Sequence, residues 1–206
     1  WQIVSDTSYE GYTTIPRYIM AGYTTMFREI DDALAVDNRD FDLIFVQAGV
    51  GSLLAAAAWY YSYTRARRPQ IIAVEPIEAA CVAESVRAGK LEHSRGSLQT
   101  IMAGLNCGTV SLIAWPFIEG GVDAVITLSD DFARLAMRTY HQPRGTDPQI
   151  ISGESGAAGL AALLALRDAP VLSAFRDQTG LTESSKVLLL NTEGDTDPDN
   201  FQSIMN

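Results

Sequence analysis

The sequence predicts an α/β fold in which a mainly parallel sheet is flanked by helices. Short, wholly apolar runs such as Leu43–Val46 and Ile71–Val74 are typical of strands buried on both faces of a sheet. Between such runs lie longer segments with apolar residues at helical spacing or with many alanines, and strands that alternate with helices form parallel sheets. The 206 residues, 47% of them hydrophobic, are enough to bury one large core.

The first expected elements are a short strand over Trp1–Val4 and a helix opened by Pro16. Proline suits the first helical position because its φ is already helical and its missing N–H is not needed there. One apolar face then recurs at helical spacing, made of Tyr18, Ile19, Tyr23, Met26, Ile30 and Leu34. A polar turn over residues 37–40 leads into the strand Leu43–Val46.

A glycine-bearing turn, Gln47–Ser52, joins that strand to an expected helix over Leu53–Arg67. Glycines let the backbone come close to a ligand because they carry no Cβ. The free N–H groups at a helix start, with the helix dipole behind them, favour an anion. The turn therefore predicts a site for a small phosphate-bearing molecule.

The rest of the chain continues the alternation. The other expected helices are Ile77–Ala88, Ile113–Glu119, Asp130–Tyr140, Ser155–Arg167 and a short one at the C-terminus; the other expected strands are Ile71–Val74, Val122–Thr127 and Val187–Leu190. Gly89 is a suitable residue to end the helix before it. Residues 91–107 and 142–148 are expected to be irregular, the latter because of its proline, glycine and polar content.

Composition limits the partners. The net charge of −10 argues against a broad nucleic-acid or anionic-membrane surface, because both need clustered lysine and arginine. The longest apolar runs are too short to span a bilayer, and no signal peptide is visible, so a cytoplasmic location is expected. Cys81 and Cys107 give neither a disulfide framework nor a metal-ligand spacing; two buried or half-buried thiols are favoured over a bridge between them.

The loops after the strands are where a ligand is expected, because parallel sheets bind ligands beyond the carboxyl ends of their strands. These loops are Ser5–Thr7, Gln47–Ser52, Glu75–Pro76 and Asn191–Asp195. In the first of them, Asp6 could act as a general base if it points inward. In the last, the hydroxyl of Thr192 could form a hydrogen bond with a buried ligand atom.

Other interpretations stay open at this point. Gly49 and Gly51 after a strand form a weak dinucleotide fingerprint, with Glu75 as the acid that would bind a ribose, but Leu54 occupies the third glycine position. A turn with no ligand is equally compatible with the two glycines. Residues 152–157 can be a simple helix cap with glycines for close packing. His93 and His141 are isolated and are expected in surface loops.

Five motifs taken together are more specific than any one of them. In chain order they are Gln47–Ser52, Val74–Pro76, Thr100–Leu105, Gly153–Ala157 and Thr192–Asp195. This combination resembles the pyridoxal-phosphate enzymes of the tryptophan synthase β-type fold (fold type II), which include the serine and threonine dehydratases. The segments Asp6–Thr7, Glu10–Tyr12, Ile151–Ala157 and Thr192–Asp197 look most like the diaminopropionate ammonia-lyases of that family.

The resemblance implies a role for each matching residue. The residues expected to hold the cofactor phosphate through backbone amides are Ala48, Gly49, Val50, Gly51 and Ser52. Thr192 would form a hydrogen bond with the pyridine nitrogen, and Asp6 would take the α-proton of the L-substrate. Glu154, Ser155 and Gly156 would line the cofactor pocket. The implied reaction is α,β-elimination of 2,3-diaminopropionate to pyruvate and ammonia by a homodimer.

The main departure from the family concerns lysine. The family's cofactor-linked lysine lies on an N-terminal segment, whereas this chain has only Lys90 and Lys186, and neither follows the family's lysine motif. Residues 1–206 are therefore expected to be a single α/β domain, most of the large cofactor domain of a longer enzyme and inactive alone, with the N-terminal segment and most of the small domain missing. The alternatives are a serine/threonine dehydratase-like lyase, a Rossmann-type nucleotide-binding domain and a non-catalytic binding module.

Overall fold

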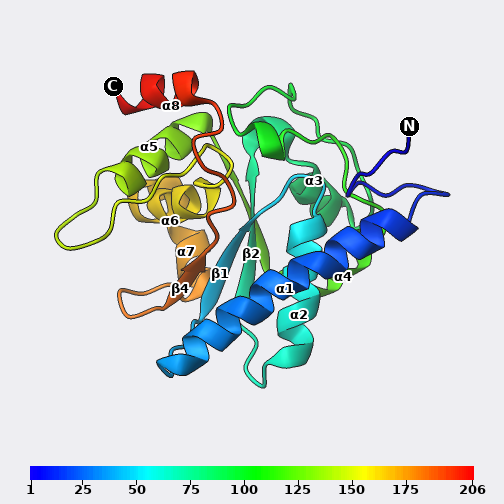
Figure 1. The fold of residues 1–206 in the computed structure, drawn as a ribbon, viewed down its shortest axis with the longest axis horizontal. Helices are drawn as coiled ribbons and strands as arrows, with labels where there is room; N and C mark the ends of the chain where they lie inside the picture. The colour runs from blue at the N-terminus through cyan, green and yellow to red at the C-terminus, as the bar shows by residue number, and fades with distance from the viewer.

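Four parallel strands form one sheet with helices on both faces in the computed structural model, which describes residues 1–206 (Figure 1). The strands are β1 (Leu43–Gln47), β2 (Gln70–Pro76), β3 (Ala124–Leu128) and β4 (Val187–Leu189), in the spatial order β3-β2-β1-β4. In the register, Leu43 lies opposite both Gln70 and Val187. The expected fold class is thereby confirmed.

Eight α-helices cover the sheet. They are α1 (Thr14–Val36), α2 (Ser52–Thr64), α3 (Cys81–Ala88), α4 (Trp115–Gly121), α5 (Asp130–His141), α6 (Ala158–Asp168), α7 (Ser173–Thr179) and α8 (Pro198–Met205), with 3-10 turns at Ile77–Ala79, Ala103–Leu105 and Pro170–Leu172. No single helix is both long enough and apolar enough to cross a membrane.

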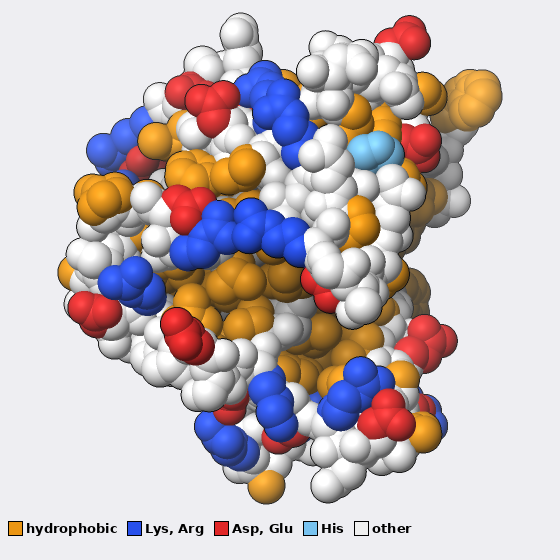
Figure 2. Space-filling model, turned by 90° about the vertical axis from the view of Figure 1, so that its left-hand side faces the viewer, with side chains coloured by type: hydrophobic (Ala, Val, Ile, Leu, Met, Phe, Trp, Pro, Cys, Tyr) orange, Lys and Arg blue, Asp and Glu red, His pale blue; other side chains and the backbone are white.

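Side chains of β1 alternate between two hydrophobic cores. Ile44 and Val46 pack with residues of α1, α2 and α4 on one face, whereas Leu43 and Phe45 pack with α5, α6 and α8 on the other. All four side chains are buried, as expected for a strand covered by helices on both sides. Figure 2 views the side of the molecule that carries α5, α6, α7 and β4, where hydrophobic side chains show in a hollow among lysine and arginine side chains.

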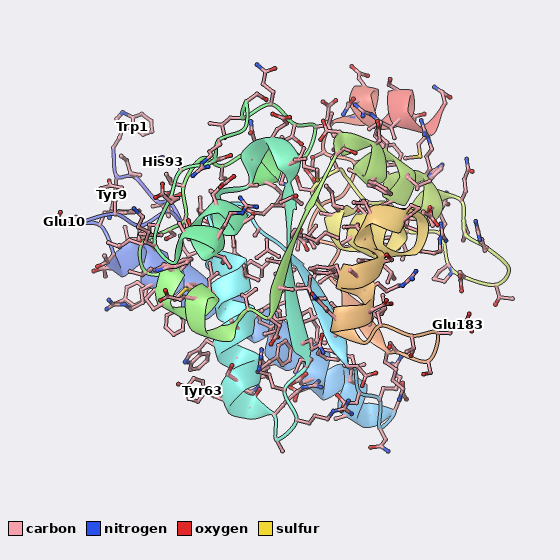
Figure 3. All side chains as sticks on the ribbon, turned by 180° about the vertical axis from the view of Figure 1, so that it is seen from behind. Trp1, Tyr9, Glu10, Tyr63, His93 and Glu183 are labelled. Atoms are coloured by element: carbon pink, nitrogen blue, oxygen red, sulfur yellow. The ribbon has the colours of Figure 1, made fainter.

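The strand expected over Trp1–Val4 is wrong. The segment is irregular and exposed, and Trp1 projects from the surface (Figure 3). A strand needs a neighbour for its backbone groups. The segment is held instead by the hydroxyl of Tyr12, which donates to the carbonyl of Ile3 (3.1 Å) and accepts the N–H of Ser5 (3.0 Å).

Several expected helices have different ends. The helix expected to reach Arg67 stops at Thr64, because Arg65 is extended and its guanidinium binds Asp31 (2.5 Å) and Asp40. The helix expected from Ser155 starts at Ala158. The one expected over residues 77–88 is divided into a 3-10 turn and α3, which Gly89 ends as anticipated. The sequence predicted no element over residues 168–186, where α7 lies.

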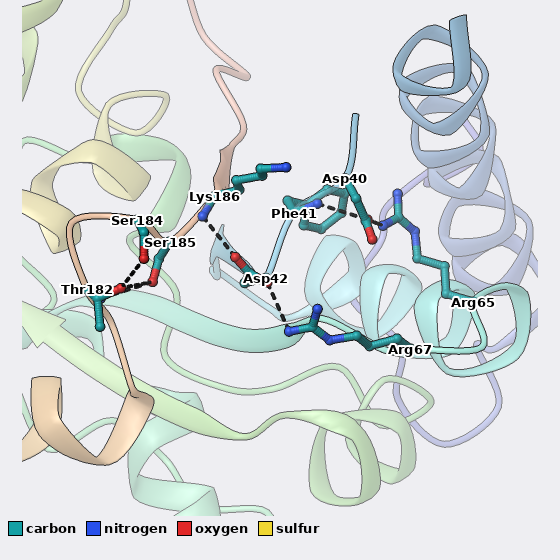
Figure 4. A network of polar contacts seen from close by, with 9 residues as sticks. All are labelled: Asp40, Phe41, Asp42, Arg65, Arg67, Thr182, Ser184, Ser185 and Lys186. Carbon is teal, nitrogen blue, oxygen red and sulfur yellow. Dashed lines mark hydrogen bonds and ion pairs between the residues drawn. The ribbon is translucent and has the colours of Figure 1, made fainter. Parts of the chain in front are cut away.

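A network of polar contacts lies at the edge of the sheet where β1 and β4 begin, opposite the edge where the strands end (Figure 4). Asp42 precedes β1, and its carboxylate accepts the N–H of Lys186 (3.0 Å) and pairs with Arg67 (3.0 Å). The N–H of Asp42 in turn donates to the carbonyl of Lys186 (2.8 Å). These bonds set the position of β4 against β1, which brings the loops that follow the two strands to the same edge.

Candidate functional site

A cavity of about 450 Å³ opens at the carboxyl edge of the sheet, beyond the end of β1. Its walls come from segments far apart in the sequence: the stretch before α1, the turn after β1, the 3-10 turn Ala103–Leu105, and the loops before α6 and after β4. Seven of the ten residues to which the family resemblance gives a role line it: Asp6, Gly49, Val50, Gly51, Ser52, Ser155 and Thr192. The expectation that a ligand site forms at this edge agrees with the geometry.

Two glycines shape the turn after β1. Gly51 has φ +90°, and a Cβ there would lie 2.6 Å from Cδ1 of the buried Ile118. A Cβ on Gly49 would lie 3.0 Å from both Sγ of Cys107 and the carbonyl oxygen of Gly104. The turn can approach the opposite wall this closely only because both residues lack a side chain.

The same turn presents unpartnered backbone donors. The N–H groups of Gly49, Gly51 and Ser52 donate to no acceptor within the chain. All three residues line the cavity at the start of α2, a helix of 13 residues, where the helix dipole favours negative charge. Free N–H groups around a helix N-terminus are the donor set that a phosphate group accepts from, so these residues fit a phosphate-bearing cofactor.

Asp6 is held at the cavity by its backbone. Its carbonyl oxygen accepts hydrogen bonds from the hydroxyls of Ser52 (3.0 Å) and Ser111 (3.2 Å). Ser111 also accepts the N–H of Ser8 at 2.8 Å, and both serines are buried. The carboxylate of Asp6 is therefore free of this anchoring and can act on a ligand.

Thr192 lies at the far side of the cavity and is tied to β1. Its hydroxyl oxygen accepts a hydrogen bond from Nε2 of Gln47 (2.6 Å), and the same nitrogen donates to the carbonyl of Leu190 (3.0 Å). Gln47 and Thr192 both line the cavity. Gln47 belongs to the motif recognised in the sequence, but no side-chain role was predicted for it.

The loop before α6 is organised by Glu193. The carboxylate accepts the N–H groups of Ser155 (2.7 Å) and Gly156 (3.3 Å). Gly156 packs so closely that a Cβ would lie 2.6 Å from Oδ1 of Asn191, and it does not line the cavity. The side chain of Ser155 does line it, and its Oγ accepts the N–H of Gly104 (3.0 Å).

Two further expected pocket residues lie outside the cavity lining. Glu154 does not line the cavity in this structure, and its carboxylate accepts a hydrogen bond from Asn200 at the start of α8. Ala48 is buried beneath the turn, and its N–H donates to the carbonyl of Val74 (2.9 Å) instead of facing the cavity.

Glu75 has a structural position. It is fully buried, and its carboxylate accepts the N–H groups of Val82 and Ala83, each at 2.8 Å, at the start of α3. Burial raises the pKa of Glu75 to about 7, although both backbone hydrogen bonds favour the charged form. A ribose-binding role for Glu75 is therefore wrong, because the side chain is fully buried and does not line the cavity, where a ligand hydroxyl would have to reach it.

The two cysteines are free thiols, as favoured from the sequence. Cys81 is buried, and burial together with the charge of Glu75 raises its pKa. Cys107 lines the cavity, and burial and the charge of Asp6 raise its pKa. Both thiols are thus held in the protonated, less reactive form.

Histidines and lysines lie elsewhere. His93 is at the surface, as expected (Figure 3). His141 does not lie in a loop: it is the half-buried last residue of α5, and it contacts Gln149 at 3.1 Å. Lys90 pairs with Glu92 at 3.1 Å, and Lys186 lies at the amino edge of the sheet. The described residues include no cluster suited to a metal ion.

Comparisons with known proteins identify relatives of the chain. Residues 3–184 match the family model described as pyridoxal-phosphate dependent enzyme. The diaminopropionate ammonia-lyase of Escherichia coli (strain K12) is 36% identical over 207 residues, an alignment that covers 100% of this chain and 52% of that protein. The diaminopropionate ammonia-lyase of Salmonella typhimurium (strain LT2) is 38% identical over 210 residues, with the same two coverages. The chain spans about half the length of the curated relatives it matches.

A solved structure repeats the likeness. The crystal structure of the Escherichia coli diaminopropionate ammonia lyase in complex with an aminoacrylate-PLP azomethine reaction intermediate superposes with a TM-score of 0.91 at 34% identity, covering 100% of this chain and 52% of that chain. The family model extends over most of the sequence and includes the turn that offers its N–H groups to an anion. The chain belongs to the family of pyridoxal-phosphate dependent enzymes.

Proposed function

We propose that the protein containing these residues eliminates ammonia from 2,3-diaminopropionate and forms pyruvate and a second ammonia. The observation that carries the proposal is the cavity itself, which has unpartnered backbone N–H groups at one end, a hydroxyl at the other and Asp6 in its wall. The similarity to the diaminopropionate ammonia-lyases supports the choice of substrate.

Within this proposal, residues 1–206 form a single α/β domain that supplies most of the cofactor-binding surface. The N–H groups of Gly49, Gly51 and Ser52 hold the phosphate of pyridoxal phosphate, and the neighbouring Val50 and Ala48 shape the turn. Thr192 faces the pyridine nitrogen, and Ser155 lines the wall between them. When bound, pyridoxal phosphate supplies the electron sink for the elimination.

Asp6 takes the α-proton of the L-substrate in this scheme. The hydroxyls of Ser52 and Ser111 hold the backbone carbonyl of Asp6, so the carboxylate can turn toward a substrate while the backbone stays in position. The residues that line the cavity include no lysine or arginine, but they include the acidic residues Asp6 and Glu193. This balance suits a substrate with a second amino group, since a positive charge is attracted to an acidic lining.

The test measures pyruvate and ammonia released by the full-length protein from 2,3-diaminopropionate, serine and threonine in the presence of pyridoxal phosphate. Turnover that is much faster on diaminopropionate supports the proposal. A preference for serine or threonine would assign the protein as a dehydratase, and cofactor binding without release of ammonia would make it a binding module. We also propose a homodimer, which sedimentation of the full-length protein checks.

A further inference from the structure

Gln47 is a buried polar residue whose side-chain amide donates two hydrogen bonds to the loop after β4. It is the last residue of β1, it is 4% exposed, and it lines the cavity. Its Nε2 donates one hydrogen bond to the carbonyl of Leu190 (3.0 Å) and one to the hydroxyl of Thr192 (2.6 Å). Both amide hydrogens are therefore used by residues that follow β4.

The orientation of this amide follows from its partners. A backbone carbonyl can only accept, so the group that faces Leu190 must be the NH₂ and not the oxygen. Rotation of the amide by 180° would place Oε1 against the carbonyl oxygen of Leu190, so that this hydrogen bond would be replaced by repulsion, and Thr192 would have to donate to Gln47. The observed orientation leaves Oε1 of Gln47 buried and without a hydrogen-bond partner. An unpaired buried acceptor costs free energy, and the two donated hydrogen bonds offset that cost.

We propose that Gln47 is a positioning residue that fixes the hydroxyl of Thr192 as a hydrogen-bond donor toward the cavity and so keeps a pyridine nitrogen bound there unprotonated. A hydroxyl has one proton, and its oxygen already accepts from Gln47. The proton of Thr192 is therefore left for an acceptor, and a pyridine nitrogen accepts only when it carries no proton. The inference rests on the proposed cofactor, but the contact between the two side chains belongs to the chain alone.

The charged groups around the cavity do not compete for this proton. The titratable residues in its lining are Asp6, Tyr23, Cys107 and Glu193. Glu193 follows Thr192 directly, yet its carboxylate accepts the N–H groups of Ser155 and Gly156 and the hydroxyl of Thr196 (3.3 Å). No carboxylate accepts a hydrogen bond from Thr192 within the chain.

The first experiment needs no cofactor. In solution NMR spectra of the ¹⁵N,¹³C-labelled chain, the side-chain amide protons of Gln47 should show nuclear Overhauser contacts to the methyl group of Thr192. They should also exchange with water at least about tenfold more slowly than those of Gln178, which is exposed on α7. A folded chain without the contact to Thr192 overturns the inference, whatever the cofactor does.

The second experiment reads the ring nitrogen itself. Pyridoxal phosphate labelled with ¹⁵N in the ring is added to the full-length wild-type protein and to the full-length variants Gln47→Glu and Gln178→Glu, the second being the matched control. Whether ionised or with its proton on the Leu190 carbonyl, a carboxyl at position 47 presents an acceptor to Thr192. The hydroxyl of Thr192 then donates its proton to the carboxyl group at position 47. Only the lone pairs of its oxygen are left to face the cavity, and these favour a ring nitrogen that carries a proton.

The expected result is a ring nitrogen that stays unprotonated in the wild type and in Gln178→Glu, and whose pKa rises by about one unit or more, a tenfold change in the proton equilibrium, in Gln47→Glu. If Gln47→Glu does not fold, Gln47→Met, which donates to nothing, should give a smaller rise in the same direction. An identical pKa in all folded variants overturns the inference. Failure of pyridoxal phosphate to bind overturns the proposed function instead, and the contact measured without cofactor still decides the role of Gln47.

Discussion

Asp6 is the residue whose predicted role can be separated most cleanly from folding. Its backbone carbonyl, not its carboxylate, accepts the hydrogen bonds from Ser52 and Ser111. We therefore expect Asp6→Asn in the full-length protein to keep its stability and cofactor affinity while turnover on the L-substrate falls by about two to four orders of magnitude. Steady-state kinetics with a cofactor titration measures both quantities.

The matched control is Asp195→Asn, which removes a carboxylate from the exposed loop after β4. It should leave turnover within a factor of about two, because surface charges contribute little to a reaction that they do not touch. Equal losses in the two variants would mean that the effect is one of general charge, and unchanged turnover in Asp6→Asn would remove Asp6 from the mechanism.

Glu75 makes stability depend on pH in an unusual direction. Its pKa of about 7 in the folded protein lies above the ordinary 4.5, so between these pH values the folded chain binds more protons at this site than the unfolded chain. The contribution of Glu75 to stability is therefore present below about pH 4.5 and is lost as the pH rises through about 7. Glu75→Gln, which resembles the protonated acid, should remove this dependence.

Urea denaturation of the wild type and Glu75→Gln between about pH 5 and about pH 8 tests this. The difference in free energy of unfolding should move by about 1–3 kcal/mol in favour of the variant as the pH rises. Glu78→Gln is the control, since that carboxylate is exposed and binds Ser97 near the surface. Parallel curves for wild type and Glu75→Gln would show that the carboxyl is not titrating in this range.

At the residue scale, the sequence could predict single positions but not pairs. The glycines of the turn could be found because they occupy a recognisable place after the buried strand β1, whereas Asp6 was placed after a strand over residues 1–4 that does not form. The bond between Gln47 and Thr192 joins residues 145 positions apart and depends on side-chain orientation, which no local pattern encodes. The contact of Glu154 with Asn200 on α8 likewise joins residues distant in sequence and follows from no local pattern.

The start of α2 is the element on which the site depends most. Gly51 has φ +90° and no room for a Cβ beside Ile118, whereas Gly11 has φ +83° with nothing within 4 Å of a Cβ. Gly11→Ala therefore carries only the backbone cost of about 1–2 kcal/mol, and Gly51→Ala should cost about 1–2 kcal/mol more. Because both glycines have a positive φ, the difference between the two losses in stability reports the close packing of Gly51 against Ile118 alone.

Chemical denaturation gives both losses, and fluorescence titration with pyridoxal phosphate gives the second readout. Gly51→Ala should also weaken cofactor binding, because the turn must shift away from Ile118 and take its N–H groups with it. Equal destabilisation by the two alanines, with unchanged affinity in Gly51→Ala, would contradict a role for close packing in the phosphate site.

At the element scale, the existence of most helices and strands could be predicted, but their ends could not. Periodic apolar residues identify α1, and buried apolar runs identify β1 and β2. The end of α2 is set by Arg65, whose partners Asp31 and Asp40 lie earlier in the chain. The strand expected over residues 1–4 failed because apolar residues alone do not provide a neighbouring strand.

For the whole molecule, the parallel sheet could be predicted from alternation, whereas the order of its strands could not. The chain places β4 beside β1, although more than a hundred residues separate them, and this pairing brings Thr192 to the turn after β1. Long-range pairings of this kind are set by the packing of both hydrophobic cores at once. The site is thus a property of the complete sheet and not of any one motif.

If the cavity holds pyridoxal phosphate, the cofactor must stabilise the complete fold, because its binding groups come from both ends of the chain. A ligand that binds only the folded state at about 100 times its Kd raises the free energy of unfolding by about 2.7 kcal/mol. Pyridoxal, which lacks the phosphate, should give little stabilisation at the same concentration, since it cannot use the N–H groups of Gly49, Gly51 and Ser52. Thermal denaturation with each ligand, in the wild type and in Gly51→Ala, measures the difference. Equal stabilisation by pyridoxal and pyridoxal phosphate would show that the turn after β1 does not hold the phosphate.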